Sequence, residues 1–138
     1  MTDDPTGTVP PLVSHVSVGI ADLGRARLFY DAIMRPLGAR LIAETSVGLG
    51  YGRRSTSFWA ARPHDNGAAS VGNGAHVCLN ADTPENVVAF HKAGLASGGL
   101  DDGLPGPRPE YAPGYYAAFL RDPDGNRIEA MCWIDARP

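Results

Sequence analysis

The sequence predicts an α+β fold in which two βαβββ modules form one domain. Three observations support this prediction. The chain has 138 residues, a length that suits a single domain. Its 17 glycines and 12 prolines divide it into mostly short segments, which favours strands over helices. The pattern of the first half also returns later in the chain, where His76 repeats His15 without a gap in the alignment, as expected for an internal duplication.

The repeat preserves both residue types and spacing. At the same offset four further pairs of residues are identical: Val16 with Val77, Phe29 with Phe90, Ala32 with Ala93, and Gly38 with Gly99. Asp22 and Thr83, which are both suited to cap the first turn of a helix, also coincide. These matches predict an equivalent strand and helix at the start of each module.

The first module spans about residues 12–62. Leu12–Ile20 is apolar and β-branched, which predicts a strand. Asp22 then caps a predicted helix. This helix is expected to run through Ala26, Phe29, Ile33 and Met34, with Phe29 on its buried face. Three strands are predicted after it, at Arg40–Glu44, Val47–Arg53 and Thr56–Ala61.

The second module spans about residues 74–134. Gly74–Asn80 predicts a strand, and Thr83 caps a helix that includes Val87–Leu95. Two strands are predicted at Tyr115–Arg121 and Arg127–Trp133, joined by the turn sequence Asp122-Pro123-Asp124-Gly125-Asn126. The intervening Asp101–Gly114 is rich in Gly and Pro, which predicts a long loop that lines or covers a cleft. One strand of the second module is therefore left without a clear sequence signal.

Composition excludes several classes of function. The formal net charge is -3 with a sequence pI near 5.7, and the basic residues are scattered, so no nucleic-acid surface is predicted. No apolar window is long enough to span a membrane. Residues 1–11 are acidic and proline-rich, which predicts a tail and not a signal peptide. Cys78 and Cys132 lie in apolar runs, which predicts buried thiols and a cytoplasmic setting.

Three polar side chains lie on the polar faces of predicted strands. Because strand side chains alternate between two faces, His15 and His76 project from the polar face of the first strand of each module. On the last strand, Glu129 projects away from the core-facing Ile128 and Ala130. Two imidazoles and a carboxylate are a common ligand set for a divalent metal ion. A single strand histidine is more often an ordinary hydrogen-bonded residue, so the metal hypothesis depends on the symmetry of the two histidines.

Other kinds of chemistry have less support. The GxSxG, GxxxxGK and GxGxxG motifs are absent. Cys78 lies on the same predicted face as His76, which leaves a nucleophilic cysteine as an alternative. His64, in a predicted loop, and His91, on a predicted helix, are expected to be solvated.

Three segments carry a family resemblance: HVSVGIADLGRARLFYDAIMRPLGARL near the start, GAHVCLNA in the middle and DPDGNRIEAMCW near the end. Over about Leu12 to Trp133, the chain resembles the vicinal oxygen chelate superfamily, which includes glyoxalase I, extradiol dioxygenases, and fosfomycin and bleomycin resistance proteins. The resemblance implies that the two modules form a curved mixed sheet around a cleft. It also implies a divalent metal ion (Zn, Fe, Mn or Ni) in that cleft and, usually, a homodimer.

The resemblance identifies His15, His76 and Glu129 as the metal ligands. Glyoxalase I has a further carboxylate ligand on the last strand of its first module, where the best register of this chain places Trp59. An indole can neither bind a metal as a carboxylate does nor serve as the base that glyoxalase chemistry takes from that ligand. The resemblance therefore favours another lyase, isomerase or dioxygenase reaction over authentic lactoylglutathione lyase activity.

Two hypotheses follow, both with a small molecule as the partner. In the first, a substrate with two adjacent oxygens chelates the metal ion, which acts as a Lewis acid. In the second, the protein is a metal-free binding module of the bleomycin-resistance type that sequesters a drug or metabolite in an aromatic cleft. The residues expected to contact the small molecule are Trp59, Arg108, Tyr111 and Tyr115.

Overall fold

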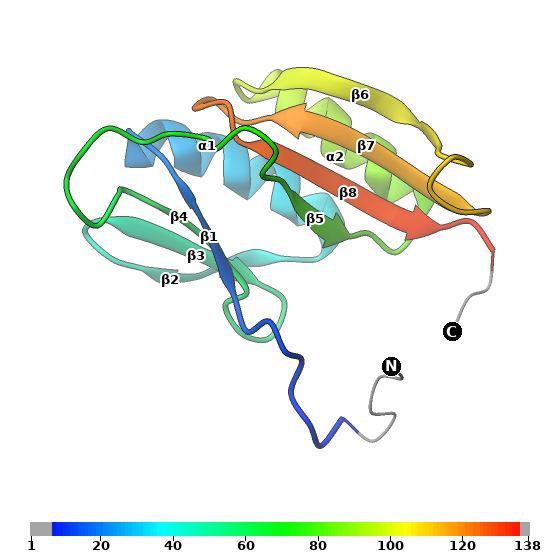
Figure 1. The fold of residues 1–138 in the computed structure, drawn as a ribbon, viewed down its shortest axis with the longest axis horizontal. Helices are drawn as coiled ribbons and strands as arrows, with labels where there is room; N and C mark the ends of the chain where they lie inside the picture. Colours follow the sequence, from blue (N-terminus) through cyan, green and yellow to red (C-terminus); the bar gives the residue numbers. More distant parts are fainter. Residues whose placement is uncertain (1–6, 136–138) are drawn as a thin grey trace.

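Each half of the chain forms a βαβββ module, which confirms the predicted α+β fold (Figure 1). The computed structural model describes residues 7–135. Module one contains β1 (Val16–Gly19), α1 (Leu23–Met34), the short 3-10 helix η1 (Arg35–Leu37), β2 (Arg40–Glu44), β3 (Gly48–Gly52) and β4 (Phe58–Ala61). Module two contains β5 (Val77–Asn80), α2 (Pro84–Ala96), β6 (Leu100–Pro107), β7 (Tyr115–Arg121) and β8 (Arg127–Trp133).

Each module forms its own four-stranded mixed sheet. The strand orders are β1-β4-β3-β2, here called sheet A, and β5-β8-β7-β6, here called sheet B. The first and last strands of each module pair in parallel, and the remaining pairs are antiparallel. Ser17 lies opposite Trp59 in sheet A, and Cys78 lies opposite Glu129 in sheet B. The registers confirm that Trp59 takes the place in module one that Glu129 takes in module two.

The two helices begin at the predicted capping residues. The side chain of Asp22 accepts a hydrogen bond from the backbone N–H of Arg25, and the side chain of Thr83 accepts one from the N–H of Asn86. The two helices contact each other and share one core cluster with residues of both sheets, and in Figure 1 α2 lies behind the strands of sheet B. The opposite face of each sheet is therefore left open.

One hydrophobic core serves both modules. Phe29 of α1 and Phe90 of α2, predicted to be equivalent buried residues, are both inaccessible to solvent and belong to the same cluster. Ile128 and Ala130 of β8 belong to it as well. Because alternate residues of a strand face opposite sides, Glu129 between them must face the open side of sheet B.

The prediction of a loop at Asp101–Gly114 is wrong in its first half. Leu100–Pro107 forms β6, which pairs with β7 only and is the edge strand of sheet B. An edge strand tolerates Gly and Pro because one side of its backbone needs no strand partner. The register between β6 and β7 also shifts at two places, which is how irregular residues are accommodated in a strand.

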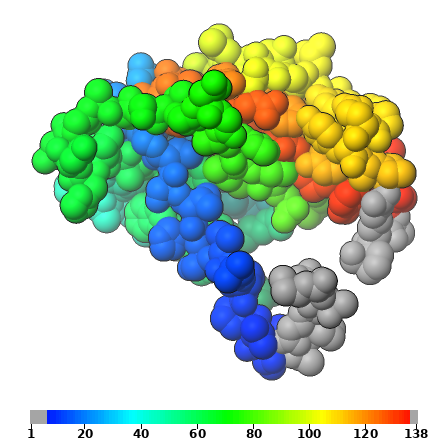
Figure 2. Space-filling model, in the orientation of Figure 1, coloured from blue at the N-terminus to red at the C-terminus, as the bar shows by residue number. Residues whose placement is uncertain are grey.

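The first strand of each module is shorter than predicted. β1 begins at Val16 and β5 at Val77, so His15 and His76 lie just before the strands. Of the predicted tail, residues 1–6 lie outside the described residues, and residues 7–11 are exposed and extend away from the two modules (Figure 2). No helix in the described part of the chain is long and apolar enough to cross a membrane.

Candidate functional site

A buried carboxylate lies at the centre of the open face of sheet B. Glu129 is only 2% exposed, and both of its oxygens have partners. Oε2 accepts a hydrogen bond from the hydroxyl of Tyr115 at 2.6 Å, and Oε1 lies 3.1 Å from Nε2 of His76. These three residues, here called the Glu129 network, come from β8, β7 and the residue before β5. Two of the three predicted metal ligands are thus brought together.

Side chains of β7 and β8 surround Glu129 in the sheet. Phe119 of β7 lies directly opposite it in the sheet. The guanidinium carbon of Arg127 lies 4.1 Å from the centre of the Phe119 ring, and the His76 ring lies 6.4 Å from it. Nε of Arg127 also donates a hydrogen bond to Asp102 of β6 at 2.8 Å. Phe119, with Arg127 and His76 near its ring, therefore lies beside Glu129 in the sheet.

The network orients the His76 ring. Burial and the hydrogen bond to Glu129 raise the pKa of Tyr115, so its hydroxyl stays protonated and donates to the carboxylate. A carboxylate that accepts from Tyr115 also favours the tautomer of His76 in which Nε2 carries the proton. The His76 side chain is 41% exposed, so a molecule arriving from solvent can reach the ring. Nδ1 is then the basic nitrogen of the neutral ring.

A small cavity lies beside His76. Its volume is about 150 Å³, and both His76 and Arg127 line it. Ser17 of β1 and Ser70 of the loop before β5 also line it. The cavity therefore joins the polar sides of the two modules next to an imidazole and a guanidinium group. Its size suits a molecule of only a few heavy atoms.

Cys78 does not have the properties of a nucleophile. It lies at the surface, which corrects the expectation of a buried thiol, whereas Cys132 is buried as expected. The Cys78 sulfur lies 3.8 Å from the Tyr115 hydroxyl. Surrounding protein atoms and the charge of Glu129 raise the pKa of Cys78 to about 12. The thiol is therefore protonated near neutral pH, and the alternative of a Cys-His pair has no support here.

An aromatic row extends along the edge of this face. The Tyr115 ring lies between Tyr111 and Trp133, with ring centres 5.3 Å apart in both pairs and near-perpendicular planes. Tyr111 and Tyr115 were expected near a ligand from their sequence context, whereas Trp133 was not. Strand alternation could have identified Trp133. It lies four positions after Glu129 on the same strand, and residues an even number of positions apart share a face.

The other two predicted substrate contacts lie elsewhere or have structural partners. Arg108 donates hydrogen bonds to the carbonyl oxygens of Leu104 at 2.7 Å and Gly106 at 2.9 Å, which holds the end of β6 in shape. Trp59 lies on sheet A over Gly48 and Gly50, where a Cβ on Gly50 would come within 3.0 Å of the indole. Trp59 therefore forms part of the open face of module one and not of the aromatic row.

The third predicted metal ligand is not part of the network. The hydrogen bond found for the exposed His15 ring is with the hydroxyl of Ser14, at 3.5 Å. Within residues 7–135, no group of three or more His, Cys, Asp or Glu side chains is arranged to hold a metal ion. Binding of a metal ion by His15, His76 and Glu129 therefore stays a prediction.

Two other histidines differ in their surroundings. His64 lies in an exposed turn, as expected. His91 is only 5% exposed, so the expectation that it would be solvated is wrong. Its Nε2 lies 2.8 Å from Oδ1 of Asp101 on β6. The edge strand that the sequence did not predict is the element that covers this histidine.

The chain is similar to several known proteins. The family model described as Glyoxalase/Bleomycin resistance protein/Dioxygenase superfamily matches residues 12–130. A glyoxalase/bleomycin resistance protein from Albidiferax ferrireducens T118 is 37% identical, with a TM-score of 0.82, and the match covers 88% of this chain and 98% of that one.

More distant structures share the fold. A glyoxalase-related enzyme from Fulvimarina pelagi is 20% identical, with a TM-score of 0.65, over 86% of each chain. A glyoxalase I mutant from Zea mays is 22% identical, with a TM-score of 0.68, over 88% of this chain and 46% of that one. No curated protein matches the chain.

Proposed function

Because the chain belongs to the glyoxalase/bleomycin resistance protein/dioxygenase superfamily, we propose that it is an enzyme that moves a proton on a small substrate with two adjacent oxygens. His76 is the proposed base, and Glu129 is the group that orients it. The observation that carries the proposal is a buried carboxylate bonded to an accessible imidazole. A carboxylate and a histidine in this relationship form an effective general base.

The proposed reaction begins in the small cavity beside His76. Nδ1 of the neutral imidazole takes the proton from a carbon next to a carbonyl group, and the electron pair of that C–H bond moves toward the carbonyl oxygen. Glu129 then stabilises the protonated imidazole, and Arg127 offsets the negative charge on the oxygen. If a proton that has equilibrated with solvent returns to the same carbon, the substrate exchanges hydrogen with solvent. If the proton instead returns to the neighbouring carbon, and the hydroxyl proton moves from one oxygen to the other, the substrate is converted to its isomer.

The aromatic row favours a second candidate function. Tyr111, Tyr115 and Trp133 form edge-to-face ring pairs beside the Glu129 network, and Tyr111 is 55% exposed. Such a surface suits a planar apolar ligand that is held but not converted. This candidate is the sequestering, metal-free alternative, with Trp133 in the role that the sequence had suggested for Trp59.

A divalent ion held by His15, His76 and Glu129 stays a prediction, and so does the homodimer. The residues of one chain supply an imidazole nitrogen and a carboxylate oxygen side by side, which is the right donor chemistry for two of the three ligands. The proton transfer proposed above involves residues of the Glu129 network and Arg127 alone.

The test measures by NMR how fast deuterium from the solvent exchanges into hydroxyacetone, a small molecule with adjacent oxygens. We expect His76→Ala to lower the exchange rate at least about 100-fold, since general-base catalysis contributes about that much, and Glu129→Gln to lower it as well. His64→Ala, at an exposed histidine outside the site, is the matched control. Equal rates in wild type and His76→Ala would refute the proposed base.

Two further arms separate the alternatives. Exchange that persists in protein treated with a chelator supports the metal-free base. Exchange that requires added Mn, Fe, Ni or Zn, and that His15→Ala abolishes, supports the metal site predicted from the sequence instead. Saturable binding of a planar ligand without exchange or turnover, weakened by Trp133→Ala, supports sequestration.

A further inference from the structure

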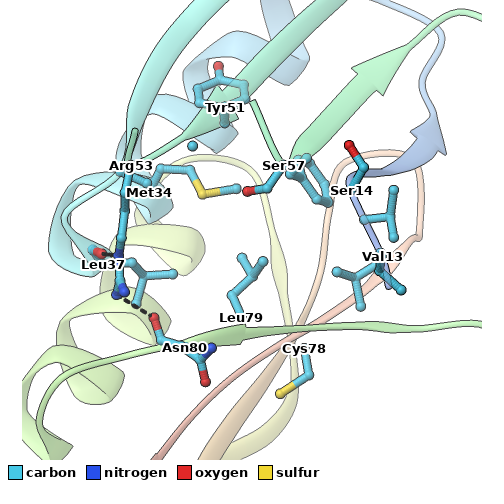
Figure 3. A pocket seen from close by; sticks show the side chains of 15 residues that line it. Val13, Ser14, Met34, Leu37, Tyr51, Arg53, Ser57, Cys78, Leu79 and Asn80 are labelled. Atoms are coloured by element: carbon cyan, nitrogen blue, oxygen red, sulfur yellow. Dashed lines mark hydrogen bonds between the residues drawn. The ribbon is translucent and has the colours of Figure 1, made fainter. Parts of the chain in front are cut away.

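A second and larger cavity lies between the two modules (Figure 3). Its volume is about 410 Å³, and its walls come from β1, β3, β4, β5 and the end of α1. This volume lies within the range of about 300–1,000 Å³ that is common for small-molecule sites. No member of the Glu129 network or of the aromatic row lines this cavity. It is therefore a separate candidate for binding.

One part of the cavity wall is apolar, while Ser14, Ser57 and Asn80 contribute polar residues elsewhere in the lining. Met34, Leu37 and Phe58 line the apolar part, and all three are buried side chains of module one. Leu79 of β5 points into the cavity from module two, whereas Cys78, the preceding residue on the strand, points away from it (Figure 3). A hydrocarbon group in this space would lose its contact with water to apolar walls on both sides, which favours binding.

One cationic side chain stands at the edge of this apolar space. Nε of Arg53 donates a hydrogen bond to the carbonyl oxygen of Leu37 at 3.0 Å, and Nη2 donates one to that of Asn80 at 2.9 Å. These bonds hold the guanidinium group between module one and module two, as the dashed lines in Figure 3 show in part. Its acidic neighbour Asp82 is 3.7 Å away and 83% exposed, so their attraction is weak and screened by water. The charge of Arg53 is therefore accessible to an anion.

We propose that this cavity binds a small carboxylic acid with an apolar body. The hydrocarbon part would lie among Met34, Phe58 and Leu79, and the carboxylate would pair with Arg53. Charge complementarity selects the anion, because Arg53 is the charged residue among those that line the cavity. The ligand would contact both modules at once, so binding should also raise the temperature at which the protein unfolds.

The proposal is tested with octanoate and the uncharged octanol, each below its aggregation limit, by calorimetric titration of the full chain. We expect wild type to bind octanoate at least tenfold more tightly than octanol. Arg53→Gln should weaken octanoate binding about tenfold and leave octanol binding unchanged, which also shows that the cavity is intact. Arg54→Gln changes the next residue, which does not line the cavity, and should match wild type.

A second variant tests the location of the site. Leu79→Trp fills the cavity and should abolish binding of both compounds, while His76→Ala should bind octanoate as wild type does. The proposal would be overturned by equal affinity for octanoate in wild type and Arg53→Gln, by binding that survives Leu79→Trp, or by no binding at all. NMR shifts confined to the Glu129 network would overturn it as well. None of these results depends on whether His76 is a base.

Discussion

At the scale of single residues, Glu129 is a carboxylate buried within a strand of sheet B. An ionised carboxylate is costly to remove from water, and it is tolerated only where hydrogen bonds compensate the loss. Tyr115 and His76 provide these bonds from two neighbouring segments. A residue that functions as an orienting group and a residue that would be a metal ligand look the same in the sequence, because both place a carboxylate on the polar face of the strand.

Tyr115→Phe removes one of the two bonds to Glu129 while keeping the ring. We expect the free energy of unfolding to fall by about 1.5–3 kcal/mol, the usual range for a hydrogen bond to a charged group. Urea denaturation measures this change. Tyr111→Phe is the matched control, because its exposed ring keeps its contact with Tyr115, and it should change stability by less than about 0.5 kcal/mol. Equal effects of the two substitutions would argue that the Tyr115 hydroxyl does not support Glu129.

At the scale of elements, the irregular strand β6 is held by polar contacts with α2, β7 and β8. Asp101 near its start forms a hydrogen bond with the buried His91 of α2, and Asp102 forms ion pairs with Arg121 of β7 and Arg127 of β8. The first residues of the strand are therefore held by a hydrogen bond to α2 and by ion pairs to β7 and β8. The Gly and Pro residues of β6 come after Asp101 and Asp102, in the part of the strand that follows these pairs.

The hydrogen bonds of the Asp101 carboxyl, with the backbone N–H of Gly103 and with the His91 ring, make stability depend on pH. The backbone N–H of Gly103 and the His91 ring both lower the pKa of the Asp101 carboxyl. A lowered pKa in the folded state stabilises the protein above the ordinary value of about 3.9, and this contribution is lost as the pH falls through the folded-state value. Asp101→Asn should therefore be less stable than wild type near neutral pH, with the difference vanishing in strong acid.

The measurement is urea denaturation of both proteins at about pH 7 and at about pH 2, conditions on either side of the carboxyl titration. Asp82→Asn serves as the control, because Asp82 is highly exposed and only loosely paired with Arg53. It should differ little from wild type at either pH. A stability difference between Asp101→Asn and wild type that is as large in acid as at neutral pH would contradict the assignment to the carboxylate.

At the scale of the whole molecule, the modules depend on each other. The turn between β7 and β8 belongs to module two, yet its Asp122 accepts a 2.5 Å hydrogen bond from the buried Tyr30 of α1. Asn126 of the same turn donates to the carbonyl oxygen of Gly19 at 2.8 Å. Together with the shared core, these bonds indicate that neither module would keep its packing without the other.

Phe29→Ala tests this dependence. Removal of a fully buried ring should lower the free energy of unfolding by about 3–5 kcal/mol. Because the core is shared, amide hydrogen exchange should become faster in β7 and β8 as well as in module one. Leu28→Ala, at an exposed position of the same helix, is expected to be nearly neutral. Unfolding in two separate steps, with protection retained in module two, would show that the modules are independent.

The sequence by itself determined the architecture of the two modules. The offset between His15 and His76, the caps Asp22 and Thr83, and the alternation around Glu129 all depend on residues close together in the chain or on the repeat. Such local patterns are set by backbone geometry and by which side chains can face a core. They were sufficient to predict the modules, the capped helices and the register that matches Trp59 with Glu129.

Only the tertiary structure decided which side chains meet. The partners Tyr115 and Glu129, His91 and Asp101, and the two walls of the cavity at Arg53 lie on different elements. Whether such groups touch depends on how sheets and helices pack, and a strand such as β6 forms because an ordered neighbour supplies its hydrogen bonds, whatever its own propensity. The same physics explains why His15 was matched to His76 by sequence but does not join it in space: symmetry fixes the face of a side chain, while the packing of the modules sets the distance between faces.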